Sequence, residues 1–236
     1  MIAIVNYDTG NIRSVANALH RVGCSEWVYT DDKTLLQQAD KVILPGVGEA
    51  SSAMAKLAER GLDTFIPTLT QPVLGICVGT QLMCQHSEEG NVECMGIFRT
   101  QVKRFLGQQS SVNTPDGSLS ILKVAFEREQ SLLVGSAEHS NFNEVNSQFS
   151  ILKVPHMGWN QITDLRTPLF KDIDEGAYIY YVHSFYPELC ADTIATTQYI
   201  NAFSGALGRD NFFGTQFHPE KSGAVGAQIL KNFLNL

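Results

Sequence analysis

Strand and helix patterns alternate through the first hundred residues, and this alternation restricts the possible folds more than any other feature of the sequence. Short apolar runs of strand length occupy residues 2–6, 41–44 and 72–76. Apolar side chains recur at helical spacing in residues 11–22 and 50–59. Because a helix between two strands allows them to lie parallel, the pattern predicts a mostly parallel sheet with helices on both faces.

The second half of the chain has a different character. Residues 178–183, 193–199 and 212–216 are strand-like and are joined by short connections. They are expected to add mixed or antiparallel strands to the same sheet. The predicted fold class is therefore α/β, with an open, mixed, mostly parallel sheet in a three-layer, flavodoxin-like sandwich.

Helical spacing also predicts which side chains face the core. In residues 11–22, where Gly23 is the C-terminal stop, they are Ile12, Val15, Ala16, Leu19 and Val22. In residues 50–59 they are Met54, Leu57 and Ala58. In a closing helix over residues 223–234 they are Val225, Ile229, Leu230 and Phe233.

Residues 106–150 interrupt this order with two polar, turn-rich stretches. The string Ser-Ile-Leu-Lys-Val occurs at residues 120–124 and again at 150–154, which suggests either a duplicated strand or two similar edge strands. Two copies are too few for a solenoid. We expect a single domain over residues 1–236, with a surface insertion at about 106–150.

Composition narrows the class of protein. The chain has 236 residues, 44% of them hydrophobic, and no apolar run approaches the roughly 20 residues of a membrane helix. The N-terminus resembles a first strand rather than a signal peptide, and a net charge of −7 argues against nucleic acid as the main partner. Five scattered cysteines fit reduced thiols in the cytoplasm, and the histidines show no metal-ligand spacing.

Cys77 lies at the joint between a predicted strand and a predicted helix. Functional groups of open α/β sheets gather where strands lead into helices. A sharp turn there lifts the side chain above the sheet and places it at a helix N-terminus, which stabilises a thiolate. Gly75 and Gly79 allow close packing around such a turn, as in the nucleophile elbow of serine hydrolases. Cys77 is a candidate nucleophile, and a buried structural cysteine is the alternative.

A candidate base follows the apolar strand near residue 212. His218 is followed two residues later by Glu220, and residues two apart in an extended segment project to the same side. Glu220 can then bind one ring nitrogen while the other faces Cys77. The result is a Cys-His-Glu triad of nucleophile, base and orienting carboxylate. A surface histidine beside a solvated glutamate is the alternative for this motif taken alone.

These motifs resemble those of the class I (triad) glutamine amidotransferases. Gly75-Ile76-Cys77-Val78-Gly79-Thr80-Gln81 resembles their nucleophile motif, Phe217-His218-Pro219-Glu220 their His-x-Glu motif, and Pro45-Gly46-Val47-Gly48 their oxyanion loop. The resemblance implies that Cys77, His218 and Glu220 hydrolyse glutamine through a thioester. It further implies an oxyanion hole from Val47, Gly48 and Val78, and contacts to glutamine from Gly46, Gly48, Gln81 and Ser184.

A narrower resemblance is to the glutaminase subunits of imidazole glycerol phosphate synthases. Its most specific string is Pro155-His156-Met157-Gly158-Trp159-Asn160, supported by Asn6–Asn11, by Val182–Phe185 and by Lys221-Ser222 after the His-x-Glu motif. This family implies a heterodimer with a (β/α)8-barrel cyclase subunit, which receives the ammonia in histidine biosynthesis and makes imidazole glycerol phosphate and an aminoimidazole carboxamide ribotide. Residues implied to face the barrel are Asn6, Asn11, Met157, Trp159, Tyr180 and Lys221. No metal or organic cofactor is implied.

Two alternative functions compete with this interpretation. The nearer is another class I amidotransferase that feeds ammonia to a different acceptor. The more distant is an α/β binding module of the same shape without activity. The string at residues 155–160 argues against the first, and the complete set of Cys77, His218 and Glu220 argues against the second.

Overall fold

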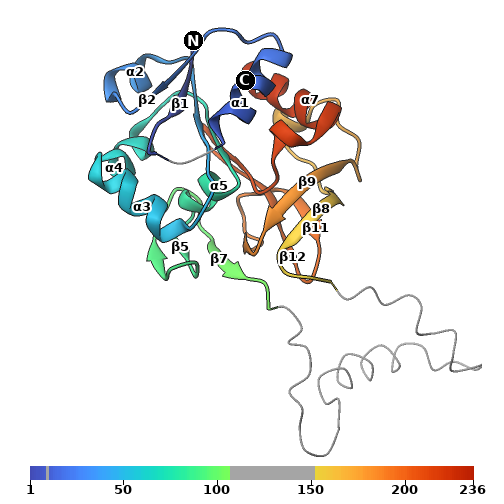
Figure 1. Ribbon diagram of the computed structural model, residues 1–236. Coiled ribbons are helices and arrows are strands. Elements are labelled where there is room, and N and C mark those ends of the chain that lie inside the picture. The colour runs from blue at the N-terminus through green and yellow to red at the C-terminus, as the bar shows by residue number, and fades with distance from the viewer. Residues whose placement is uncertain (9–10, 107–151) are drawn as a thin grey trace, which may run out of the picture. The chain divides into compact units, whose positions relative to one another are not determined.

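The computed structural model describes residues 1–8, 11–106 and 152–236 (Figure 1). Its main sheet is built from β1 (Ile2–Val5), β2 (Trp27–Thr30), β3 (Lys41–Leu44), β4 (Val73–Ile76), β11 (Thr193–Gln198), β12 (Ala202–Arg209) and β13 (Phe212–Thr215). The strand order is β11-β12-β13-β4-β3-β1-β2. Strands β2, β1, β3, β4 and β13 run parallel to one another, β12 pairs antiparallel with β13, and β11 pairs antiparallel with β12. The predicted open, mixed, mostly parallel sheet is confirmed.

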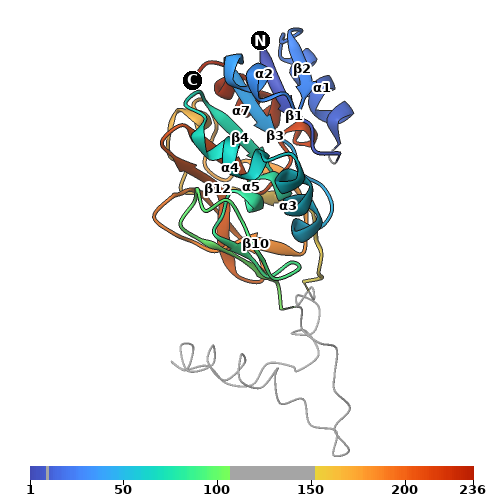
Figure 2. The same cartoon turned by 90° about the vertical axis from the view of Figure 1, so that its left-hand side faces the viewer.

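Helices cover both faces of this sheet. They are α1 (Ile12–Arg21), α2 (Lys33–Gln38), α3 (Ala50–Glu59), α4 (Leu62–Phe65), α5 (Val78–Leu82) and α7 (Gly223–Leu234), with 3-10 turns η1 (Ile66–Thr68), η3 (Pro168–Phe170) and η4 (Pro219–Lys221). Figures 1 and 2 show α1 and α7 on one face and α2, α3 and α4 on the other. The predicted three layers are present.

The predicted core faces of the long helices are mostly correct. Val15, Leu19, Leu57 and the α7 residues Ile229, Leu230 and Phe233 are buried. Ile12, Val22, Met54 and Val225 are partly buried and pack against the core. Ala58 is exposed, contrary to the prediction, and Ala53 occupies the buried face of α3 instead.

Residues 178–183 do not join the main sheet as predicted. They form β9 (Tyr178–His183), which pairs antiparallel with β8 (His156–Gln161) in a separate two-stranded ribbon. Trp159 lies opposite Tyr180 in this pairing. Burial alternates along both strands, so one face of the ribbon covers aromatic core residues and the other faces outward.

A second small sheet lies beside the nucleophile helix. It contains β5 (His86–Ser87), β6 (Val92–Glu93), β7 (Gln101–Arg104) and β10 (Phe185–Pro187), in the order β10-β7-β5-β6. Because β10 follows β9 after Ser184 alone, this sheet and the ribbon hold that residue between them.

Residues 1–105 and 154–236 form one compact unit, and residues 106–153 are assigned to a second. The predicted insertion and the first Ser-Ile-Leu-Lys-Val copy fall on residues 107–151, outside the described part of the chain. Of the second copy, Leu152–Val154 are described and form no strand, so the expectation of a repeated strand is wrong for that portion. No helix among the described residues has the length and hydropathy needed to cross a membrane.

Candidate active site

Cys77 lies on a sharp turn between β4 and α5. Its backbone is left-handed, with φ of 53° and ψ of −112°, which is rare for a residue with a side chain. The Cys77 N–H donates to the carbonyl of Thr215 on the neighbouring strand over 2.7 Å. The predicted nucleophile elbow is therefore present, and the sulfur projects from the carboxyl end of the sheet.

The elbow and the loop after β3 leave no space for side chains where they touch. A Cβ atom on Gly79 would lie 2.0 Å from the Leu44 carbonyl oxygen, and one on Gly46 would lie 2.0 Å from the Gly79 nitrogen. Both obstructing atoms belong to backbone and cannot move aside. Glycine at these positions fixes the distance between the candidate oxyanion loop and Cys77.

His218 and Glu220 are buried together at the end of β13. Nδ1 of His218 lies 2.8 Å from Oε1 of Glu220, and their side chains are 4% and 2% exposed. The contact is as predicted, but its geometrical reason is not. Glu220 lies in the 3-10 turn η4 that begins after His218, so a tight turn rather than an extended segment brings the two together.

Glu220 leaves the other ring nitrogen of His218 available for chemistry. Among the buried side-chain atoms that the structure describes, Nε2 of His218 and Oε2 of Glu220 have no hydrogen-bond partner. Burial alone lowers the pKa of His218, but the neighbouring Cys77 and Glu220 outweigh it and raise that pKa to about 10. These two neighbours favour the protonated imidazole, which can deliver a proton from Nε2.

One cavity of about 310 Å³ contains the side chains of Cys77 and His218. It is lined by Gly46, Val47, Gly48, Cys77, Val78, Gln81, Glu89, Val182, His183, Ser184, Phe185, His218 and Lys221. All predicted oxyanion and glutamine-contact residues thus lie around the candidate nucleophile and base. Glu220 stands behind His218 and is absent from the lining.

The candidate oxyanion residues come from two loops. Gly48 has a φ of 93°, a left-handed conformation that glycine adopts at little cost, and Val47 beside it is 40% exposed. Val78 is the first residue of α5, where backbone N–H groups point out of the helix. Donors from both sides can therefore converge above Cys77.

Gln81 is 2% exposed, unlike the helix-surface amide that was its alternative interpretation. Its Nε2 donates to the Phe185 carbonyl over 3.0 Å and to Gln216 Oε1 over 2.9 Å. Both amide hydrogens are thus used within the chain. The Gln81 oxygen remains as the atom that can accept a bond from a ligand.

Sequence reasoning missed Glu89, a carboxylate that lines the cavity. Glu89 Oε2 accepts a bond from the Ala50 N–H at the start of α3 over 2.9 Å. Burial raises the pKa of Glu89 despite this bond. The only sequence signal is the acidic pair at residues 88–89, in the turn between β5 and β6, which by itself resembles an ordinary solvated loop.

Most of the residues predicted to face a partner lie on adjoining elements, β8, β9, η4 and α1, and Lys221 among them lines the cavity. Met157 and Trp159 of β8 are 63% and 56% exposed, and Trp159 meets Tyr180 edge to face at 6.0 Å between ring centroids. Lys221 is exposed and also lines the cavity. Asn11 caps α1 through the Ser14 N–H, and α1 contacts η4, which holds Lys221. Asn6 follows β1 and accepts a bond from the Asp8 N–H.

In residues 1–8, 11–106 and 152–236, no group of three or more His, Cys, Asp or Glu side chains is placed to hold a metal ion. The five cysteines are free thiols.

Comparisons with known proteins agree with this geometry. The family model for glutamine amidotransferase class-I matches residues 3–236. Imidazole glycerol phosphate synthase subunit HisH from Bacteroides fragilis (strain YCH46) is 47% identical over 235 residues, covering 100% of this chain and 99% of the relative. The subunit of the same name from Pectobacterium atrosepticum is 43% identical over 237 residues, covering 99% of each.

Solved structures agree on the fold. A putative GMP synthase protein from Thermoplasma acidophilum superposes with a TM-score of 0.63 at 17% identity, covering 99% of this chain and 92% of its own. A second structure, described as a glutamine amidotransferase, gives a TM-score of 0.63 at 14% identity and covers 100% of this chain and 98% of its own. The chain belongs to the class-I glutamine amidotransferase family, and within it to the family of imidazole glycerol phosphate synthase HisH subunits.

Proposed function

We propose that this chain is the glutaminase subunit of an imidazole glycerol phosphate synthase. It hydrolyses glutamine to glutamate and ammonia and passes the ammonia to a cyclase subunit in histidine biosynthesis. The observation that carries the proposal is the convergence of Cys77, His218 and the 45–48 loop on one cavity, with Glu220 bonded behind the base.

Each residue has a chemical role in this proposal. The Cys77 thiolate attacks the side-chain amide carbon of glutamine, and the N–H groups of Val78 and of the Val47–Gly48 segment stabilise the oxyanion. The protonated His218 donates its Nε2 proton to the leaving nitrogen, which departs as ammonia and leaves a glutamyl thioester. Neutral His218 then takes a proton from water, which attacks the thioester and releases glutamate and the thiolate. Glu220 keeps the ring oriented and balances its charge.

The cavity also offers groups for the α-amino and α-carboxylate end of glutamine. Glu89 supplies a carboxylate for the ammonium group, and the bond from the Ala50 N–H to its Oε2 holds that carboxylate at the cavity. Gln81 and Ser184 line the cavity on the helix and ribbon sides, and Gly46 and Gly48 line it from the loop. These contacts hold the side-chain amide over Cys77.

The ammonia acceptor in this proposal is a (β/α)8-barrel cyclase subunit that docks over the cavity. The exposed Met157 and Trp159 provide an apolar contact, and Lys221 continues it at the cavity. The resemblance adds Asn6, Asn11 and Tyr180 to this surface. A docked barrel would keep ammonia from escaping into water. The cyclase subunit then forms imidazole glycerol phosphate and an aminoimidazole carboxamide ribotide.

Glutamate release, measured both with and without the barrel subunit in its ribonucleotide-bound form, tests the proposal. We expect slow hydrolysis by the chain alone and a clear increase with the loaded barrel. Full activity that is indifferent to the barrel would favour another class I amidotransferase, which a pull-down would then identify by its acceptor. No hydrolysis under any condition would favour the inactive binding module.

A further inference from the structure

Gln216 is fully buried beside Cys77, and the mechanism above gives it no role. It follows β13 directly, and its backbone N–H donates to the Gly205 carbonyl over 2.9 Å, which fixes its position. The bond from the Cys77 N–H to the Thr215 carbonyl places the two residues side by side at the ends of adjacent parallel strands. Backbone geometry therefore aims the Gln216 side chain at the nucleophile.

The sulfur of Cys77 has two polar neighbours of opposite kinds. Gln216 Nε2 lies 3.7 Å away as a donor, and the Val182 carbonyl oxygen lies 4.0 Å away as an acceptor. A thiol can donate to the carbonyl, whereas a thiolate can only accept. The shorter contact is the one that suits the thiolate, which the reaction requires.

Two successive hydrogen bonds, which begin at a backbone carbonyl, decide which end of the Gln216 side-chain amide faces Cys77. The Phe185 oxygen can only accept, so the Gln81 atom that faces it must be nitrogen. The same nitrogen donates to Gln216, so Gln216 presents its oxygen to Gln81. Its own nitrogen must then face Cys77. A flipped amide would place two nitrogens against each other and oxygen against the sulfur.

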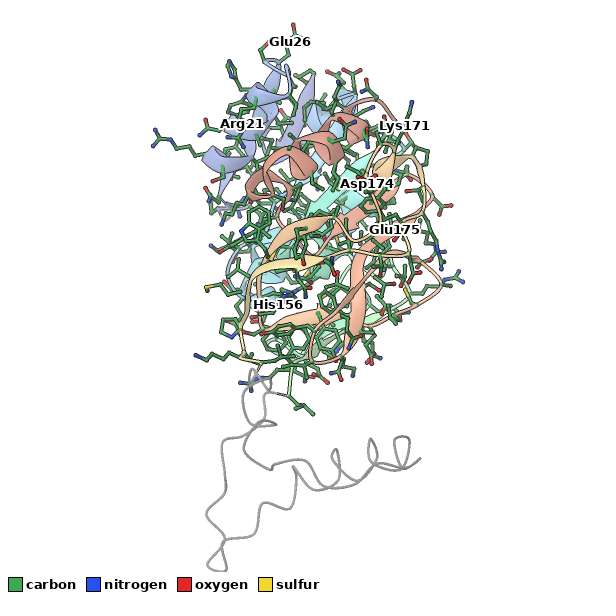
Figure 3. The ribbon with its side chains drawn as sticks, turned by 90° about the vertical axis from the view of Figure 1, so that its right-hand side faces the viewer. Arg21, Glu26, His156, Lys171, Asp174 and Glu175 are labelled. Atoms are coloured by element: carbon green, nitrogen blue, oxygen red, sulfur yellow. The ribbon has the colours of Figure 1, made fainter. Side chains whose placement is uncertain are left out.

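The same carbonyl fixes the protons of two buried histidines. His183 Nδ1 lies 2.8 Å from the Phe185 oxygen and must carry a proton, so Nε2 of the neutral ring accepts from His156 Nδ1 at 3.0 Å. His156 Nε2 then accepts from Asn160, whose nitrogen also donates to the Gln198 carbonyl. Figure 3 shows His156 at the start of β8.

Both of these histidines are neutral. Burial lowers the pKa of His183 to about 3 and that of His156 to about 4. Because neither ring is charged, only one assignment of donors and acceptors satisfies the hydrogen bonds that lead from Asn160 through the Phe185 carbonyl to Gln216. The donor that faces Cys77 is held in place by a buried network rather than by one flexible side chain.

Helix α5 has five residues, and His218, whose pKa the neighbouring Cys77 and Glu220 raise, is the charged group that faces the sulfur. A neutral N–H donor adds to the effect of both. We propose that Gln216 stabilises the Cys77 thiolate through its Nε2–H, and that Gln81 and the Phe185 carbonyl orient this donor. The inference rests on the proposed glutaminase function and adds a residue to its nucleophile site.

Gln216→Met tests the inference, because methionine has a similar length and shape but no N–H donor. The measurement is the rate of Cys77 alkylation by iodoacetamide as a function of pH in the full chain, with Cys77→Ala as the background for the other thiols. We expect the midpoint of the pH profile to rise by about one unit. In the complex with the barrel subunit we expect kcat to fall about tenfold while KM for glutamine stays within about twofold. Gln71→Met, which removes an amide bonded to the Leu36 carbonyl away from the cavity, is the matched control and should leave both measurements unchanged.

An unchanged midpoint in Gln216→Met would overturn the inference, as would an increase in KM alone, since either result assigns Gln216 a purely structural role. Gln216→Glu is the second variant in case the methionine variant does not fold. It keeps the oxygen that accepts from Gln81 and turns a carboxylate oxygen toward the sulfur, so the midpoint should rise further. A midpoint that stays or falls would contradict the inference. Because alkylation is independent of glutamine, a failure of the proposed function would appear in the hydrolysis assay and leave this test intact.

Discussion

Nδ1 of His218 and Oε1 of Glu220 lie 2.8 Å apart within one tight turn, so the carboxylate fixes the imidazole ring from the side opposite the cavity. The pair is buried, and a charge on either partner depends on the other. The three triad residues act together, and the role of each can be tested by mutating it alone.

Cys77→Ala should abolish glutamine hydrolysis, because the thioester cannot form. Glu220→Gln should lower turnover by about a hundredfold and thus less than Cys77→Ala, because the base is misoriented while the nucleophile remains. Glutamate release measures both effects. Cyclisation supplied with external ammonia is the control and should survive in the assembled complex with Cys77→Ala. Normal glutamine hydrolysis by Cys77→Ala would rule out the nucleophile assignment.

Gly79→Ala should remove glutaminase activity and lower the thermal midpoint, because its Cβ would lie 2.0 Å from the Leu44 carbonyl oxygen. Gly48→Ala provides a graded comparison. Nothing lies within 4 Å of a Cβ there, so only the left-handed φ of 93° opposes it, at a cost of about 1–3 kcal/mol. We expect a folded Gly48→Ala protein with reduced hydrolysis. Equal stability losses in the two variants would contradict the steric distinction.

Stability should fall as pH drops from about 6.5 toward 4, because His156 and His183 have lowered pKa values. The unfolded chain binds protons in this range that the folded chain excludes, so each histidine contributes a slope of up to about 1.4 kcal/mol per pH unit. His218, whose pKa is raised, acts in a different window. It stabilises the fold below pH 6.5, and that contribution is lost as pH rises toward 10.

His156→Gln should flatten the acid slope by about one proton, as measured by urea unfolding at several pH values. Carboxylates that titrate in the same range are common to both proteins and cancel in the comparison. His20→Gln, on the exposed face of α1, is the control and should keep the wild-type slope. An unaltered slope in His156→Gln would show that the buried ring does not resist protonation.

Trp159→Ala should weaken association with the barrel subunit or its stimulation of glutaminase activity, because Trp159 is a large apolar residue that is 56% exposed. Trp27→Ala is the matched control. Trp27 is 38% exposed on β2, an edge strand of the main sheet, whereas Trp159 lies in the separate β8–β9 ribbon. Loss of the Trp27 side chain should leave association unchanged. Titration of the barrel subunit into each variant gives both affinities. Equal affinities would place the docking surface elsewhere.

Replacing residues 107–149 with a short Gly/Ser linker should leave the fold and the triad intact. The cavity-lining residues that the structure describes come from the flanking parts of the chain. The two polar, turn-rich stretches of this segment are typical of a surface excursion. Cooperative unfolding and glutamine hydrolysis are the measurements. An insoluble or non-cooperative protein would show that the segment belongs to the core.

The sequence allowed the sheet type, the long helices and the triad to be predicted because each depends on local patterns. Residues 50–59 and 223–234 form helices with the predicted limits. Strand β12 was missed because Gly205 and Gly208 weaken a strand pattern. A Cβ on Gly205 would lie 2.8 Å from the Thr197 hydroxyl oxygen, a contact that no local pattern reveals.

Two of the predictions that failed have different causes. The turn that brings Glu220 to His218 is local but was interpreted as an extended segment, whereas β9 pairs with β8 instead of the main sheet because of tertiary packing. The cavity position of Glu89 and the bond from Gln216 to Cys77 join segments distant in the sequence. Long-range packing decides such contacts, so they become visible only once the chain is folded.

The position of β13 has a consequence for how activity arises during synthesis. This strand comes late in the chain yet occupies the middle of the main sheet, between β4 and β12. A nascent chain that has reached Arg209 contains Cys77 and the complete 45–48 loop, but it has neither His218 nor the strand that aligns the elbow. Partly synthesised chains are therefore unable to consume glutamine. Hydrolysis begins only after the final strand has entered the sheet, so only a fully folded chain is active.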